Sequence, residues 1–294
     1  MAKKHVTITI MTVITLGIIH ATVVGQERGT PRVMGETGAD SSANKGPEGP
    51  AIGDGMAAIK HAAEAGKYLF VFFHNGEDQQ TQAMRQVFDA AMERIADKAE
   101  SRVIDTTDRT EKGIVDKFDA RRAPMPLVLA IAPNGAITGG FPIKFTEELL
   151  MGALVSPSTA QCMKALQDGK MVFLCVQDDA TKFGKEAMQA VRAVQSDPKY
   201  AKSTEIVAVD PSDEAEAVAM KRLQVDTGSD EAITILMTPP GTVISRIEGA
   251  TTKQSLVAVI QGALAKAKGG CCPGGKCGPK KAASSKSRPA KRKS

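Results

Sequence analysis

Apolar and polar positions between residues 56 and 265 form a pattern that occurs twice along the chain. Each copy opens with a helical stretch that ends at Gly-Lys, and a short run of almost continuous apolar residues follows at once. These runs cover residues 68–73 and 171–176. Short apolar runs with polar flanks are typical of strands that are buried on both faces of a sheet. We therefore expect two domains, each built around a central buried strand.

The elements after each apolar run also correspond. They are amphipathic helices at 79–100 and 182–195, second strands at 102–105 and 205–210, short helices at 111–119 and 213–223, and strand-then-turn segments at 127–135 and 233–241, each leading into a further strand and a closing helix. The offset between corresponding positions drifts only from 103 to 106 residues. Order and spacing kept over the whole unit predict a tandem duplication, with domains at 56–156 and 157–265. This element order predicts an α/β fold, a mixed sheet with helices on both faces.

The N-terminal segment has a different pattern. Lys3 and Lys4 precede an uncharged apolar run at 6–19, and small residues follow up to Gly25. These are the three parts of a signal peptide, which we predict over residues 1–25. The protein is then exported, to a periplasm or to the outside of the cell; an uncleaved N-terminal membrane anchor is the alternative, although the run is short for a span. Residues 26–55 lack apolar periodicity and are expected to form a flexible linker.

Composition and charge exclude several classes of protein. The 294 residues include no Trp, two Tyr and four His, which argues against aromatic nucleic-acid platforms and His-rich metal centres. Ten of the 38 basic residues follow residue 265, where no acidic residue occurs, so residues 5–265 carry a net charge of −7. The basic tail could hold the protein on an anionic surface, such as lipid or cell-wall polymer, or only keep it soluble. Export argues against nucleic acid as a partner.

One motif and the element order together resemble a known family. Ala123-Pro124-Met125-Pro126 stands just before a predicted strand. With this motif the first repeat resembles exported thioredoxin-like domains, and the second repeat resembles the same fold without the motif. The resemblance covers residues 56–154 and 159–265, and it implies two tandem thioredoxin-like domains. In that family the proline at the position of Pro126 is cis and lies beside a redox-active Cys-x-x-Cys motif.

The cysteines of that motif are missing here. Aligning the long helix of the first repeat places Glu77, Asp78, Gln79 and Gln80 where the family carries Cys-x-x-Cys. Thiol–disulfide exchange needs a low-pKa thiolate at the helix start and a second thiol, so we predict a redox-inactive domain. Glu77 and Asp78 are expected to cap the helix, with an acid–base role as the alternative. His74 has no nucleophile or metal ligand beside it in sequence, and no enzyme is predicted.

Pro126 provides the best candidate site. In the family the cis proline exposes the backbone of the preceding residue, here Met125, to pair with an extended peptide by strand addition. The resemblance therefore implies a peptide-binding groove formed by Met125 and Pro126 with residues 77–80, and a protein or peptide as the partner. The alternative is a turn proline that opens a strand and serves folding alone. The second repeat has Ala232 in this position and is expected to be structural.

The five cysteines fall into two groups. Cys162 lies in a predicted helix and Cys175 in an apolar strand, so both are expected to behave as small buried hydrophobic residues. Cys271, Cys272 and Cys277 lie in the Gly- and Lys-rich residues 266–294, where no packed structure is expected. These three sulfurs could bind Cu(I) or Zn(II), form disulfides in an oxidising compartment, or have no specific role. A thiol-redox or soft-metal protein acting through this tail is the alternative to a binding or scaffold protein.

Overall fold

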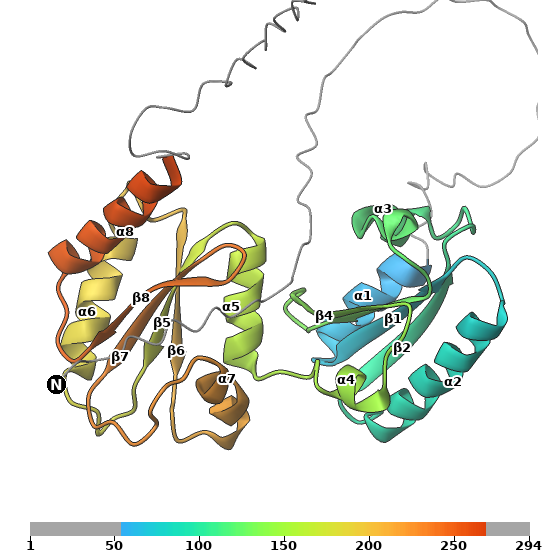
Figure 1. The fold of residues 1–294 in the computed structure, drawn as a ribbon, viewed down its shortest axis with the longest axis horizontal. Coiled ribbons are helices and arrows are strands. Elements are labelled where there is room, and N and C mark those ends of the chain that lie inside the picture. The colour runs from blue at the N-terminus through green and yellow to red at the C-terminus, as the bar shows by residue number, and fades with distance from the viewer. Residues whose placement is uncertain (1–53, 269–294) are drawn as a thin grey trace, which may run out of the picture. The chain divides into compact units, whose positions relative to one another are not determined.

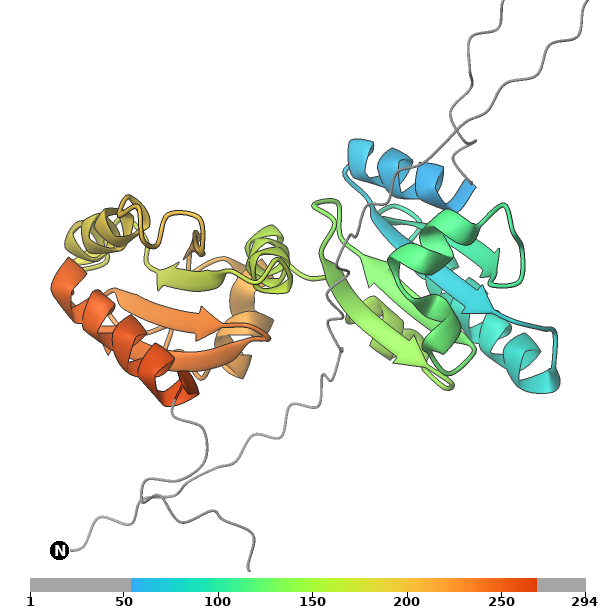
Figure 2. The same cartoon turned by 90° about the horizontal axis from the view of Figure 1, so that it is seen from above.

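The computed structural model describes residues 54–268, with side chains described up to residue 265. The chain divides into two compact units between Gly169 and Lys170, except that the turn Pro239–Gly241 groups with the first unit. Each unit contains one four-stranded sheet with helices on both of its faces (Figures 1 and 2). The predicted signal peptide, most of the predicted linker and the cysteine-containing part of the tail lie outside the described residues.

The first unit is built on the central strand β1. Its strands are β1 (Tyr68–His74), β2 (Ala99–Asp105), β3 (Leu127–Ile131) and β4 (Ile137–Pro142). They lie in the order β2-β1-β3-β4, with β2 parallel and β3 antiparallel to β1, and β4 antiparallel to β3. The helices of this part of the chain are α1 (Asp54–Glu64), α2 (Gln79–Arg94), α3 (Lys112–Lys117), the 3-10 turn η1 (Ala120–Arg122), α4 (Glu147–Met151) and α5 (Pro157–Gln167).

Strand β1 is buried on both faces because its side chains alternate between two apolar layers. Phe70 and Phe72 pack in a cluster with residues of α2 and α4, whereas Val71 and Phe73 pack in a second cluster with residues of α1 and α3. All four side chains are at most 1% exposed. Burial of such a side chain contributes about 1.5–3 kcal/mol, so the two layers fix the register of this strand.

The second unit repeats this arrangement. Its strands β5 (Met171–Val176), β6 (Thr204–Val209), β7 (Ile233–Thr238) and β8 (Thr242–Glu248) lie in the order β6-β5-β7-β8, with the same parallel and antiparallel pairing. Its helices are α6 (Gly184–Gln195), the 3-10 turn η2 (Glu214–Glu216), α7 (Ala217–Arg222) and α8 (Lys253–Lys268). Phe173 and Cys175 pack with residues of α6 and α8. The predicted fold class and the duplication are therefore confirmed.

Some predicted element limits differ from the structure. The helix predicted over 79–100 ends at Arg94, and residues 99–100 instead begin β2. The reason is the register of the parallel pair, because Tyr68 at the start of β1 lies opposite Ala99. At the other end, α8 continues to Lys268, past the predicted domain end at residue 265.

The helix α5, which the repeat pattern assigns to the second domain, bonds to the first unit. The side-chain amide of Gln167 donates to the carbonyl of Ile137 in β4 at 2.7 Å and accepts from its N–H at 2.9 Å. Just before this helix, the Tyr68 hydroxyl donates to the carbonyl of Val155 at 2.7 Å. These bonds attach α5 to the first sheet, and the predicted domain limits of 56–156 and 157–265 stay predictions.

The two cysteines of the described region are free and buried. Burial raises the pKa of the Cys162 thiol to about 11 and that of the Cys175 thiol to about 12. Both thiols are therefore protonated near neutral pH, and neither can act as a thiolate nucleophile.

This burial predicts slow thiol chemistry. In a variant with Cys271, Cys272 and Cys277 replaced by Ser, the two remaining thiols should react with a disulfide reagent on the order of 100-fold more slowly than an exposed cysteine peptide. Absorbance assays in buffer and in denaturant measure this difference, since unfolding should make both thiols reactive. Fast reaction of either thiol in the folded variant would contradict the buried positions.

Candidate functional site

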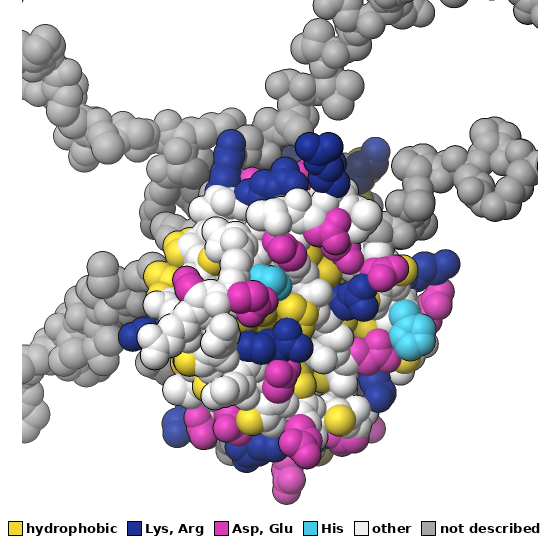
Figure 3. Space-filling model, turned by 90° about the vertical axis from the view of Figure 1, so that its right-hand side faces the viewer, with side chains coloured by type: hydrophobic (Ala, Val, Ile, Leu, Met, Phe, Trp, Pro, Cys, Tyr) yellow, Lys and Arg dark blue, Asp and Glu magenta, His cyan; other side chains and the backbone are white. Residues whose placement is uncertain are grey.

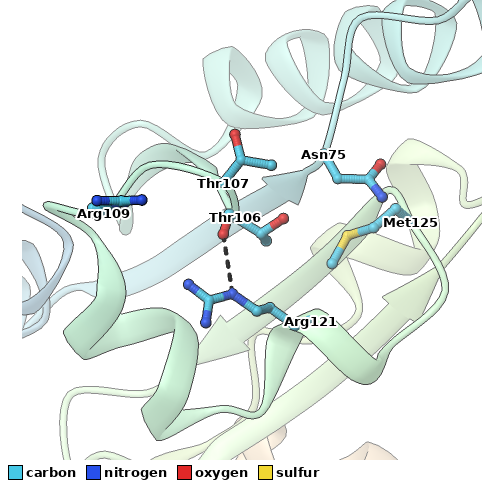
Figure 4. Close-up of a pocket in the computed structure, with 6 residues that line it drawn as sticks. All are labelled: Asn75, Thr106, Thr107, Arg109, Arg121 and Met125. Carbon is cyan, nitrogen blue, oxygen red and sulfur yellow. Dashed lines mark hydrogen bonds between the residues drawn. The ribbon is translucent and has the colours of Figure 1, made fainter.

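The candidate site of the first unit lies where three strands meet. Because β2 is parallel and β3 antiparallel to β1, the segments that follow β1 and β2 approach the segment that precedes β3. A hollow of about 390 Å³ opens there. Its lining residues are Asn75, Thr106, Thr107, Arg109, Arg121 and Met125. In Figure 4, Asn75 and Met125 lie near each other at one end of this hollow and Arg109 lies at the other.

The Met125–Pro126 peptide bond is cis, as the resemblance implied. Pro126 is buried, and Met125 is partly exposed. Within residues 54–268, no hydrogen bond of the Met125 N–H or carbonyl is found. The N–H and carbonyl of Met125, a residue that lines the hollow, are therefore unpaired within the described residues.

The start of α2 holds the four residues that the alignment placed at the missing cysteines, and all four are exposed. Asp78 is the N-cap residue, and its carboxylate accepts a hydrogen bond from the N–H of Thr81 at 2.7 Å. This bond lowers the pKa of Asp78. The interacting pair, three residues apart, is thus Asp78 and Thr81 rather than Glu77 and Gln80.

The side chains of Glu77 and Gln80 contact other residues than Asp78 and Thr81. The Glu77 carboxylate lies 3.6 Å from Nδ1 of His74, whereas the side-chain amide of Gln80 donates to the carbonyl of Ile143 at 3.2 Å. For Gln79 the structure shows only an exposed side chain at the first position of α2. The capping role predicted for two carboxylates therefore belongs to Asp78.

His74 ends β1 and joins two loops of the site. Its carbonyl accepts hydrogen bonds from the N–H and the hydroxyl of Thr106, at 2.8 and 3.0 Å. The ring is buried, and its Nδ1 has no hydrogen-bond partner in the described part of the chain. No described Ser, Cys or Lys side chain bonds to this ring, so no nucleophile–base pair forms around it.

The arginines of the hollow were not predicted from the sequence. The Arg121 Nε–H donates to the carbonyl of Thr106 at 3.3 Å, drawn as the dashed line in Figure 4, and its side chain is 50% exposed. Arg109 is exposed. The Thr106 and Thr107 hydroxyls already donate to the His74 carbonyl and the Asp105 carboxylate, so the guanidinium groups are the donors with which the hollow can bind carbonyl or carboxylate oxygens. The only sequence signal for Thr106 was its place after a strand.

Ile143 lies on the other side of Pro126, directly after β4. Its N–H donates to the Pro126 carbonyl at 2.7 Å. Its φ of +68° lies in the left-handed region, where a β-branched residue is strained by about 1–3 kcal/mol. The side chain is nevertheless 43% exposed. Nothing in the residue pattern around Ile143 indicates this conformation.

The second unit is closed at the corresponding place. Ala232 stands in the position of Pro126, and its N–H donates to the carbonyl of Lys182 at 2.9 Å. The Lys182 N–H in turn donates to the carbonyl of Asp230 at 2.7 Å, and the two side chains form an ion pair. The loop before α6 is thus paired with the segment before β7. The other cis peptide bond among the described residues, Pro239–Pro240, lies instead in the turn between β7 and β8.

No metal site or membrane span is found in the described region. Residues 54–268 contain no group of three His, Cys, Asp or Glu side chains placed to hold a metal ion. Nor does any helix in this range have the length and apolar content needed to cross a bilayer. Cys271, Cys272 and Cys277, the predicted soft-metal ligands, lie outside it.

The strand order β2-β1-β3-β4, its pairing pattern and the cis proline before β3 define the first unit as a thioredoxin-like domain, and the second unit repeats the sheet. The chain matches no protein-family model and no curated protein. Among solved structures it is similar to the first two thioredoxin domains of Saccharomyces cerevisiae Eps1p, at 9% identity and a TM-score of 0.27, over 74% of this chain and 99% of that chain.

Two longer proteins also give matches. Human ERp44 matches at 11% identity and a TM-score of 0.30, over 70% of this chain and 55% of that chain. ERdj5 matches at 11% identity and a TM-score of 0.26, over 69% of this chain and 27% of that chain. Similarities at these TM-scores carry no argument of their own, so the fold class rests on the strand order and pairing within each unit.

The capping geometry predicts a pH-dependent contribution from Asp78. Replacing Asp78 by Ala should lower the melting temperature at neutral pH, because the Thr81 N–H loses its acceptor. Since the pKa of Asp78 is lowered on folding, its contribution is present above the ordinary aspartate pKa and is lost as the pH falls through the lowered value. Thermal unfolding of the variant and the wild type over this pH range measures it.

Glu77→Ala is the matched control, since Glu77 makes no capping hydrogen bond in the described structure. It should leave the melting temperature at neutral pH almost unchanged. An equal loss in both variants would mean that the charge near the helix end, and not the Asp78–Thr81 bond, stabilises α2.

Proposed function

We propose that the first unit binds an extended segment of a partner protein by strand addition at Met125, and that the chain is an exported, redox-inactive thioredoxin-like binding protein. The observation that carries this proposal is the unpaired main chain of Met125 beside the hollow. An N–H and a carbonyl of one residue that both lack partners can pair with the main chain of an added strand. Export rests on the sequence of residues 1–25 alone.

The second unit supports this reading by contrast. There the chain pairs with itself, because the Ala232 N–H bonds to the loop before α6. Pro126 has no N–H and cannot make that bond. The corresponding loop residue of the first unit, Glu77, uses its carbonyl to accept from the Gln82 side chain instead. The first unit is therefore open at the place where the second is closed.

A thiol-based activity of the two units has no support in their chemistry. Residues 77–80, which the alignment places at the cysteine positions of the resembling family, include no cysteine, and both described cysteines are buried thiols with raised pKa values. A binding role needs no such group. Acidic and basic side chains are interspersed on the face of the first unit seen in Figure 3, with small apolar areas between them. A partner is therefore not expected to be attracted to this face by an electrostatic potential of one sign.

Main-chain pairing alone gives a weak complex. Each main-chain hydrogen bond contributes about 0.5–1.5 kcal/mol net, whereas micromolar affinity requires about 8 kcal/mol. Two bonds at Met125 therefore set the direction and register of the peptide, and contacts of its side chains must supply most of the affinity. The hollow beside Met125, with its guanidinium donors, is one place for such contacts.

The proposal is tested with an array of synthetic peptides and with Pro126→Ala. The array should yield peptides that bind the full chain, and the variant should bind them at least about tenfold more weakly, a loss of about 1.4 kcal/mol. The reason is that residue 126 gains an N–H, which can pair with the loop before α2 as Ala232 pairs with Lys182. Fluorescence polarisation with one labelled peptide measures the affinity.

Pro124→Ala is the matched control, because Pro124 is an exposed proline of the same loop and its replacement should leave the affinity unchanged. Methylation of single backbone nitrogens of the peptide adds a second readout. It should abolish binding at one position only, that of the peptide N–H that donates to the Met125 carbonyl, since a strand directs successive N–H groups to opposite sides. Equal binding by all methylated peptides would contradict strand addition.

A further inference from the structure

We propose that Ile143 determines which peptides the first unit accepts, by offering its side chain to an apolar residue of the bound segment. This inference rests on the proposed function. It deepens that function by naming the class of ligand, an extended peptide with an aliphatic or aromatic side chain at the position that faces Ile143.

Ile143 is fixed at the edge of the proposed binding site from two sides. Its N–H donates to the carbonyl of Pro126 at 2.7 Å, and its own carbonyl accepts from the side-chain amide of Gln80 at 3.2 Å. It thus connects the residue after Met125 with the start of α2. Because Ile143 is bonded to the residue that follows Met125, its side chain is a near neighbour for a side chain of a strand that pairs with Met125.

The second unit shows what the fold requires at this position. There Gly249 follows β8, its N–H donates to the Ala232 carbonyl at 2.8 Å, and its φ is +75°. This is the same hydrogen bond and the same left-handed conformation as at Ile143. Glycine adopts that conformation without strain, so the architecture itself gives no reason for isoleucine.

The two units also differ in the space above this residue. A Cβ at Gly249 would lie 2.6 Å from the Glu231 carboxylate, so in the second unit the end of the Glu231 side chain occupies this space and would have to move aside for one. In the first unit the position of Glu231 is taken by Met125, and the Ile143 side chain remains 43% exposed. The first unit therefore keeps a strained apolar residue whose side chain is far from fully buried by the protein itself. Backbone strain of this kind is typical of functional sites, and a bound apolar side chain would bury what is exposed.

The test compares Ile143→Gly with the wild type on a positional-scanning peptide array and in thermal unfolding. The wild type should select Leu, Ile, Val, Met or Phe at one peptide position, and the variant should lose this selection and bind the best peptide about tenfold more weakly. Its melting temperature should equal or exceed that of the wild type, because glycine relieves the strain. A merely structural residue would instead lose stability when it is replaced.

Two control variants separate the possible results. Ile143→Val keeps a branched apolar side chain and should keep most of the selectivity, and Val243→Thr changes another exposed apolar residue, outside the proposed site, and should change neither readout. If Ile143→Gly keeps the apolar preference while Pro126→Ala still abolishes binding, the inference about Ile143 is wrong and the proposed function stands. If the wild type selects no peptide at all, both are wrong.

Discussion

The structure of each unit depends on a central strand that is buried on both faces and paired on both edges. In β1, alternate side chains enter two separate apolar layers, so a shift of one residue would exchange Phe72 and Val71 between layers of different shape. This fixed register also fixes where the strand ends. His74 and Asn75 leave the sheet at a defined point, next to the end of β2 and the start of β3, and the candidate site is made of the loops that must meet there.

The two units share one sheet arrangement, but they differ at that point in a single N–H group. With Ala232 the entrance to β7 bonds to the loop before α6, and with Pro126 the entrance to β3 cannot. The residue after the last strand of each sheet also differs between the two units. Gly249 satisfies the left-handed turn without strain beside Glu231, whereas Ile143 makes the same turn and exposes part of its side chain. These differences between the copies thus lie around the entrance to the third strand of each sheet.

The sequence contained most of the fold but only part of the site. The central strands could be predicted because burial on both faces leaves a continuous apolar run, and the duplication could be predicted because order and spacing repeat. The end of α2 could not, because Ala99 joins β2 through its pairing with Tyr68, a contact between distant segments. Thr106, Arg109 and Arg121 were missed for the same reason, since only the folded sheet brings their loops together. Pro126 was found because a family resemblance, rather than periodicity, pointed to it.

The cap at the start of α2 illustrates a finer limit. Alignment through the apolar positions of α2 placed Glu77 and Gln80 at the cysteine positions, while in the structure the N-cap contact joins Asp78 and Thr81. The N-cap is the residue just before the helix whose backbone angles are not helical and whose side chain accepts from a free N–H group. Which of two neighbouring carboxylates takes this position depends on the path of the preceding loop, which the sequence does not show. The bond from the Thr81 N–H to the Asp78 carboxylate orders this helix start. Near it, the entrance to β3 keeps a cis proline and a Met125 main chain without hydrogen-bond partners among the described residues.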